Sequence, residues 1–119
     1  MKLLFRSFVD DEKSEYTTNL NVVDKGFSFQ DKQNNSLVYI FKEEDSLVLR
    51  RMGSITQELI FKEGQKTPTK YENVDGLSLD LEISTIAAKL TETGFFLHYD
   101  LLMDKKVVSN HKILGKVIK

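Results

Sequence analysis

The chain contains no cysteine and a single proline, Pro68. The absence of cysteine excludes a disulfide framework, a thiolate nucleophile and a cysteine-based metal site. Pro68 cannot donate a backbone hydrogen bond, so we place it at the start or edge of a strand. Histidine is also scarce, since His98 and His111 are the only two.

Long hydrophobic runs are missing as well. No stretch approaches the ~20 apolar residues of a membrane span. The apolar residues at the N-terminus stop at Arg6, whereas a secretory signal needs roughly 7–15 of them in a row. We therefore expect a cytoplasmic protein with no membrane span.

Neither sign of charge dominates, because 17 basic and 18 acidic residues give a net charge of −1. This balance excludes the basic surface that is typical of nucleic-acid binding. The chain also lacks a glycine-rich phosphate loop, a nucleophile elbow and a zinc-protease motif. The acidic groups at 10–12 and 43–45 fall in expected turns. We expect no enzyme activity and no cofactor.

What the chain does have is alternation. In residues 77–83, four aliphatic residues alternate with three polar ones, and successive side chains of a strand point to opposite faces. This segment therefore has one apolar and one polar face. Similar stretches predict about ten strands. They lie at 2–9, 16–22, 27–29, 37–41, 46–52, 55–62, 67–72, 77–84, 95–103 and 107–118, with a shorter piece at 86–91.

Residues 86–91 allow two interpretations. Leu79, Ile83, Ile86 and Leu90 also have the spacing of one helix face, so a helix at 87–90 is the alternative. The β-branched run at 83–86 and the strict alternation before it favour a strand.

Many short strands with few breaks predict a closed sheet. An open sheet of this size would need a partner to cover its apolar face, whereas a barrel buries that face and removes both edges. A length of 119 residues with 40% hydrophobic content suits one domain with a real core. We therefore predict an all-β, single-domain antiparallel barrel over residues 1–119.

Several segments resemble the YwiB-like family, small bacterial proteins with a calycin-like β-barrel and no assigned function. Residues 47–53 resemble its strand end apolar–x–apolar–x–Arg–x–Gly, and residues 59–64 resemble the Phe–x–x–Gly that follows. Tyr71 and Gly76 match its Tyr–x–Thr–Pro–aromatic–Gly turn, and 99–101 and 110–113 resemble its last two strands.

This resemblance covers residues 45–115 and departs from the family at 73–75, where Asn-Val-Asp stands instead of Thr-Pro-aromatic. Whatever that proline and aromatic residue do is therefore not carried over. The resemblance implies a calycin- or lipocalin-like barrel of about 8–10 strands and little about activity.

Arg51 is the charge that the alternation places among aliphatic residues. A two-residue turn at 53–54 would put Val48, Arg50 and Met52 on one face with residues 55, 57, 59 and 61. A three-residue loop at 52–54 would put Leu47, Leu49 and Arg51 there instead. We prefer the second register because its face is the more apolar and because it agrees with the family position of the arginine.

An ionised guanidinium cannot be buried alone, so Arg51 must find a carboxylate, backbone carbonyls, water or an anionic ligand. One hypothesis makes Arg51 an anion anchor in the barrel lumen. The other makes it a plug that bonds to carbonyls at one barrel end. The expected helpers of the anchor are Gln57, Tyr39, Tyr71 and Tyr99, and the expected walls are Leu47, Leu49, Leu59, Phe61, Leu79 and Leu81.

The two histidines lie on one expected hairpin. A two-residue loop at 104–105 would pair His98 with His111 and bring Asp100 next to them, close enough to share a metal. A three-residue loop would send the two rings to opposite faces. Two histidines without a firm third ligand make a poor zinc site, so we expect no metal.

We therefore expect a non-catalytic protein that binds a small, partly apolar, anionic ligand in its lumen. The alternative is a structural or interaction module, a filled barrel whose outer face binds a partner protein or a second copy as a homodimer. Its support is a set of apolar residues at expected outward positions: Val38, Ile40, Val48, Met52 and Ile60.

Overall fold

The computed structural model describes residues 1–118, which form ten antiparallel strands. They are β1 (Lys2–Val9), β2 (Glu12–Val23), β3 (Gly26–Asp31), β4 (Ser36–Glu43), β5 (Ser46–Gly53), β6 (Ile55–Phe61), β7 (Lys66–Asn73), β8 (Ser78–Thr91), β9 (Gly94–Met103) and β10 (Lys106–Ile118). Each strand pairs with the next, and β1 also pairs with β10, which closes the barrel. The predicted all-β antiparallel barrel is confirmed.

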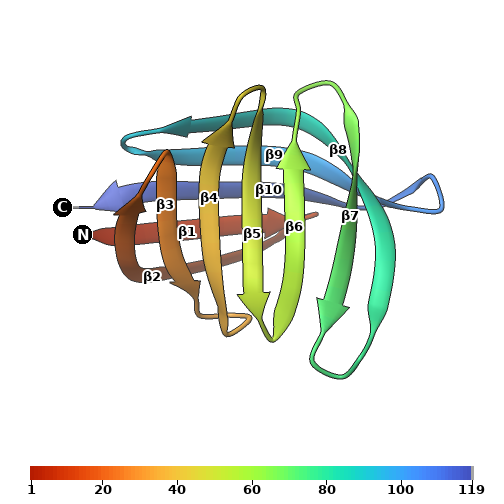
Figure 1. The fold of residues 1–119 in the computed structure, drawn as a ribbon, viewed down its shortest axis with the longest axis horizontal. Helices are drawn as coiled ribbons and strands as arrows, with labels where there is room; N and C mark the ends of the chain where they lie inside the picture. The colour runs from red at the N-terminus through yellow and green to blue at the C-terminus, as the bar shows by residue number, and fades with distance from the viewer. Residues whose placement is uncertain (119) are drawn as a thin grey trace.

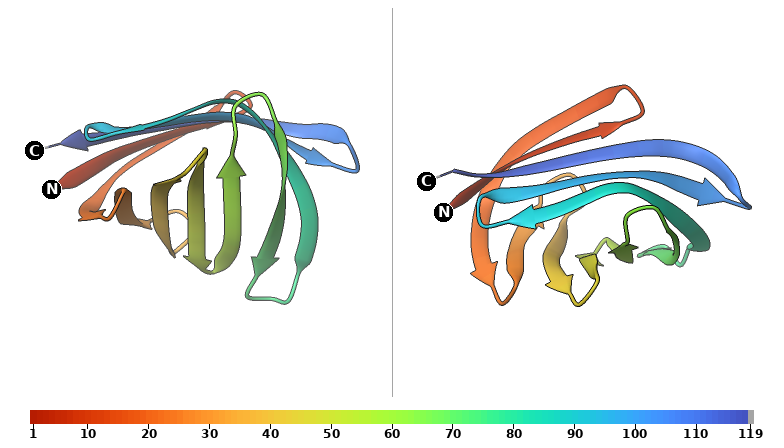
Figure 2. Two further views of the ribbon diagram at one scale, coloured as in Figure 1. Left: turned by 45° about the horizontal axis from the view of Figure 1, so that its top comes forward. Right: turned by 90° about the horizontal axis from the view of Figure 1, so that it is seen from above.

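The strands form two layers that cross each other. Figure 1 shows β3 to β7 side by side in front, with β1, β10 and β9 running across behind them. β8 belongs to both layers, because it starts beside β7 and curves round to lie beside β9. The start of β1 and the end of β10 lie next to each other, where Lys2 pairs with Ile118 (Figure 2).

The course of β8 decides between the two interpretations of residues 86–91. The strand runs from Ser78 to Thr91 without a break in extended structure, so the strand prediction is confirmed and the helix is wrong. Its register with β9 shifts between Thr85 and Ala87, which is a β-bulge. A bulge bends its strand, and this one lies where β8 passes between the layers.

None of the residues 1–118 form a helix with the length and apolar character that a membrane span requires.

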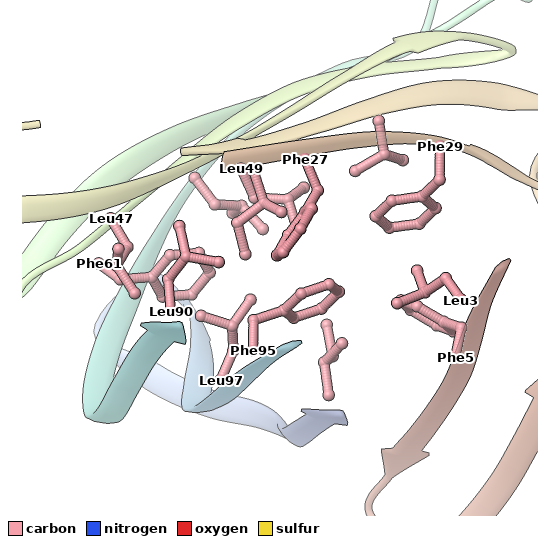
Figure 3. Packing of buried hydrophobic residues seen from close by; sticks show 14 of the residues in the cluster. Leu3, Phe5, Phe27, Phe29, Leu47, Leu49, Phe61, Leu90, Phe95 and Leu97 are labelled. Atoms are coloured by element: carbon pink, nitrogen blue, oxygen red, sulfur yellow. The ribbon is translucent and has the colours of Figure 1, made fainter. Parts of the chain in front are cut away.

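Apolar side chains fill much of the barrel interior (Figure 3). Phe29 and Phe61 are about 1% exposed, and the rings of Phe5, Phe29 and Phe95 follow one another at 5.7 and 6.0 Å between centroids. Four of the predicted wall residues, Leu47, Leu49, Leu59 and Phe61, belong to this core. Leu81 is buried and Leu79 is half-buried on the same face.

The orientation of β4 differs from the prediction. Val38 and Ile40 are 1% and 0% exposed and pair with Phe29 and Phe27 in the core, so Tyr39 between them points outward. The predictions that Tyr39 points inward and that Val38 and Ile40 point outward are therefore wrong. Both faces of β4 are apolar, so its alternation could not choose between them.

The other three predicted outward residues do lie on the outer face. Val48 pairs with Phe41 on one side and Ile60 on the other, and these neighbours leave it only 2% exposed. Met52 is the most open of the three at 41%. The guanidinium of Arg50 lies 5.4 Å from the centre of the Phe41 ring and covers part of this surface.

Gly115 on β10 leaves room for a core ring. Gly115 is paired directly with Phe95, and a Cβ at Gly115 would overlap the Phe95 side chain. We predict that Gly115→Ala lowers the free energy of unfolding by about 1–3 kcal/mol, the usual cost of overpacking. Chemical denaturation measures it. Adding Phe95→Leu should recover part of the loss, and a simple sum of two losses would contradict the explanation.

Candidate functional site

Arg51 lies on the inner face of β5, as the preferred register predicts. The β5–β6 ladder pairs Leu47 with Phe61, Leu49 with Leu59 and Arg51 with Gln57. Pairing between β5 and β6 ends there, so the connection is wider than the three-residue loop we expected. The same residues nevertheless share the inner face, because a shift by two positions keeps the alternation.

Gln57 and Tyr71 continue the row that Arg51 starts. Gln57 pairs with Arg51 on one side and with Tyr71 of β7 on the other, and all three side chains are half-buried. Beyond Gln57 and Tyr71 the pairing of β6 with β7 stops, and side chains bridge the two strands. Thr67 and Thr69 donate their hydroxyl protons to the carbonyl oxygens of Ile60 and Glu58 at 2.5 and 2.7 Å.

A hollow of about 490 Å³ lies over this region. Its lining includes Arg51, Gln57 and Thr69 from the inner face together with outward residues of β5, β6 and β7, Pro68 among them. Two of the predicted site residues are therefore reachable from outside the barrel.

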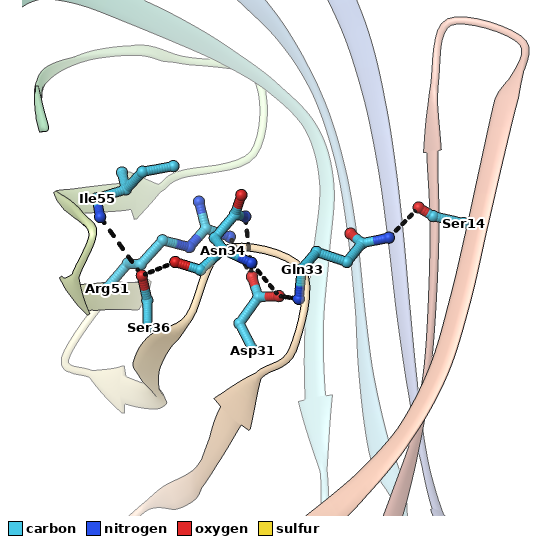
Figure 4. Close-up of polar contacts among 7 residues, drawn as sticks. All are labelled: Ser14, Asp31, Gln33, Asn34, Ser36, Arg51 and Ile55. Carbon is cyan, nitrogen blue, oxygen red and sulfur yellow. Dashed lines mark hydrogen bonds and ion pairs between the residues drawn. The ribbon is translucent and has the colours of Figure 1, made fainter.

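The partner of Arg51 is Asp31, at the end of β3. Arg51 Nη2 lies 3.6 Å from Asp31 Oδ2, and the two side chains are 14% and 3% exposed. Asp31 is held by its own turn, because it accepts hydrogen bonds from the backbone N–H of Gln33 at 2.9 Å and from Nδ2 of Asn34 at 3.1 Å (Figure 4). Such local bonds are typical of Asp at the start of a turn.

This ion pair does not satisfy the guanidinium. The distance of 3.6 Å exceeds that of a hydrogen bond. Arg51 Nε is buried and has no hydrogen-bond partner within residues 1–118. Buried donors are normally paired, so Arg51 retains unused donor capacity.

The charge of Arg51 acts on three further side chains, Tyr16, Tyr99 and His111. Tyr16 stacks on Phe5 with 4.8 Å between ring centres, and its buried hydroxyl has no partner in the described part of the chain. Burial and the nearby Asp31 carboxylate raise the pKa of Tyr16. Tyr99 is 5% exposed and stacks on His111 at 4.8 Å. Burial raises the pKa of Tyr99 to about 12, although the charge of Arg51 lowers it slightly. We call Tyr16, Asp31, Arg51, Tyr99 and His111 the lumenal cluster.

Four of the five predicted site residues therefore lie on the inner face, namely Arg51, Gln57, Tyr71 and Tyr99, and Tyr39 does not. The sequence interpretation missed Asp31. A signal was present, because Asp31 continues the inward positions of Phe27 and Phe29 and precedes a polar turn.

The two histidines do not meet. The loop at Asp104 and Lys105 has two residues, as one alternative required, and both have positive φ angles of 52° and 67°. A bulge between Val107 and Ser109 then shifts the ladder, so His111 pairs with Tyr99 and His98 pairs with Lys112. His98 faces outward and lies 3.2 Å from Asn110 Nδ2. The alternative in which His98 and His111 pair and share a metal is therefore wrong.

Comparison with known proteins gives one family and one fold. The family model described as "Domain of unknown function (DUF1934)" matches residues 8–114. The crystal structure of the YwiB protein from Bacillus subtilis superposes with a TM-score of 0.69 at 19% sequence identity, covering 99% of this chain and 91% of that chain. Likeness at this identity shows the fold alone. No curated protein gives a significant match.

The Arg51–Asp31 ion pair should contribute to stability. Arg51→Met leaves the Asp31 carboxylate buried without its counter-ion, so we expect a loss of about 3 kcal/mol in the free energy of unfolding. Adding Asp31→Asn should recover more than half of that loss. Chemical denaturation of the two single variants and the double variant measures the coupling, and additive effects would mean that the pair contributes nothing.

His111 should make stability depend on pH. Burial lowers its pKa below the ordinary value of 6.5, so the unfolded chain takes up a proton at a higher pH than the folded chain does. The contribution of neutral His111 to the free energy of unfolding is therefore fully present above pH 6.5. It is lost as the pH falls through the lower pKa that His111 has in the folded protein. Denaturation between about pH 5 and 8 should show this loss in the parent and in His98→Gln but not in His111→Gln. Equal slopes in all three would refute the assignment.

Proposed function

This chain belongs to the DUF1934 family of domains of unknown function, and from that premise we propose that it is a non-catalytic binding protein. Its ligand is a small, partly apolar molecule held at the lumenal cluster. One observation carries the proposal: Arg51 is largely buried, yet its only ion pair among the described residues is 3.6 Å long and its Nε has no partner. A polar group of a ligand would supply the missing acceptor.

The surroundings of Arg51 suit a ligand with two kinds of surface. Gln57 and Tyr71 stand beside it in the same row and offer further hydrogen bonds. Leu79, which pairs with Tyr71 on the same inner face and is half-buried, offers apolar contact. Because Asp31 already balances the charge of Arg51, the ligand's polar group need not be an anion. A carbonyl, amide or hydroxyl group meets the same need.

Three groups of the cluster, the two phenols and the Asp31 carboxylate, are suited to binding rather than to base catalysis, which supports a non-catalytic role. The raised pKa values keep Tyr16 and Tyr99 protonated near neutral pH. The Asp31 oxygens accept hydrogen bonds from their own turn and form an ion pair with Arg51. Neither phenol nor carboxylate is therefore free to act as a general base.

The test compares two tyrosine variants that carry the same chemical change. We predict that native mass spectra of the gently purified protein show a mass excess that disappears on denaturation. Tyr16→Phe should lose this excess while keeping the parent's melting temperature, because the Tyr16 hydroxyl has no hydrogen-bond partner within residues 1–118. Tyr39→Phe, on the outer face, is the control and should retain it.

A bare protein in every spectrum, or equal retention by the two variants, would refute binding at the cluster. A bare dimer would favour the alternative, in which the outer face of β4, β5 and β6 contacts a second copy. The apolar residues that this face presents at least partly to solvent are Leu37, Tyr39, Phe41, Met52 and Ile60.

A further inference from the structure

The opposite end of the barrel from the lumenal cluster carries a larger hollow of about 890 Å³. It lies between the β2–β3 and β8–β9 turns, beside the last residues of β10. We define this terminal hollow by Val22, Lys25, Phe27, Lys42, Leu90 and Val117, which are among its lining residues. Its size falls in the range of small-molecule sites.

The floor of the terminal hollow is the end of the apolar core. Phe27 and Leu90 are 4% and 6% exposed and belong to the core cluster, and Val117 packs against that cluster. Val22 stands at the rim and is 63% exposed. The hollow therefore combines apolar residues at its floor and at part of its rim with polar and charged residues around them.

Two lysines stand together at the rim. The backbone N–H of Lys42 donates to the carbonyl oxygen of Lys25 at 3.0 Å, so the two side chains leave neighbouring positions of β4 and the β2–β3 turn. Neither appears among the ion pairs of residues 1–118. Glu92 also lines the hollow but lies more than 4 Å from both ammonium groups. Like charges on adjacent positions repel each other, and an anion between them would relieve that repulsion.

We propose that the terminal hollow binds a free amphipathic carboxylate, with its hydrocarbon tail on Phe27, Leu90 and Val117 and its carboxylate between Lys25 and Lys42. The apolar floor selects the tail, and the unpaired ammonium groups select the charge of the head group. This site is separate from the lumenal cluster, because the filled core lies between them. It does not depend on the proposed function.

The experiment uses decanoate below its micelle-forming concentration as the probe, with titration calorimetry for affinity and amide NMR shifts for location. Shifts should concentrate at Val22, Lys25 and Leu90. Lys25→Gln combined with Lys42→Gln should weaken binding about ten-fold, since an exposed charge contact accounts for up to about five-fold. Lys66→Gln combined with Lys112→Gln changes the net charge equally at positions outside the hollow and should leave the affinity unchanged.

Two more arms separate tail from head and one site from the other. Decanol has the same tail without the charge, so its binding should be weaker and insensitive to the lysine changes. Val22→Thr, at an exposed position that folding tolerates, should weaken decanoate binding about two-fold, because one methyl contact is lost. Tyr16→Phe should not change it, so failure of the lumenal cluster and failure of this site are distinguishable.

Three results would overturn the proposal. They are no decanoate binding, equal affinity in both lysine pairs, or binding only to vesicles of phosphatidylglycerol. The last result would identify the hollow and its lysines as a lipid-surface contact instead.

Discussion

Closure of the sheet is the constraint on which the rest of the structure depends. β1 pairs with β2 and with β10 over its whole length from Lys2 to Val9, so the two ends of the ladder meet. In a closed sheet every side chain faces either the shared interior or the outside, and a slip by one residue would reverse an entire strand. The register that buries Leu47 and Leu49 therefore also buries Arg51. Asp31 on β3 supplies the negative charge that partly compensates the burial of the Arg51 guanidinium.

The fold was predictable wherever one face of a strand is clearly polar. Residues 77–83 are of this kind, and their inner face was assigned correctly. In the hairpin through Gly53 the outer face also carries Val48, Met52 and Ile60, but the other face is the more apolar and was assigned correctly. β4 is apolar on both faces, so only its pairing with β3 and β5 decides that Val38 and Ile40 point inward. The bulge between Val107 and Ser109 has no compositional signature either. It exists because β10 accommodates one more residue than β9 along the same stretch.

The site was predictable to the extent that it is local. Arg51 and Gln57 face each other across one hairpin, so alternation alone places both side chains on the same inner face, although the loop between them is longer than predicted. Asp31 reaches Arg51 across the intervening strand β4, and His111 comes from β10, so neither is brought to Arg51 by a single hairpin. A single sequence does not state how close residues of such separate strands come to each other in the folded protein. It does state that a buried arginine needs a partner, and this requirement predicted a carboxylate, backbone carbonyls, water or an anionic ligand without choosing among them.

The seam between β1 and β10 also bears on how the protein is made. A hydrogen bond at this seam joins Asp10 to Asn110, 100 residues further along the chain. A ribosome therefore releases β1 long before its second partner exists, and the nascent sheet meanwhile presents unpaired backbone at both margins. Such margins are sites of edge-to-edge association, and contacts this distant form slowly. The growing chain therefore completes its sheet only after β10 has been made, and both margins stay open to such association until then.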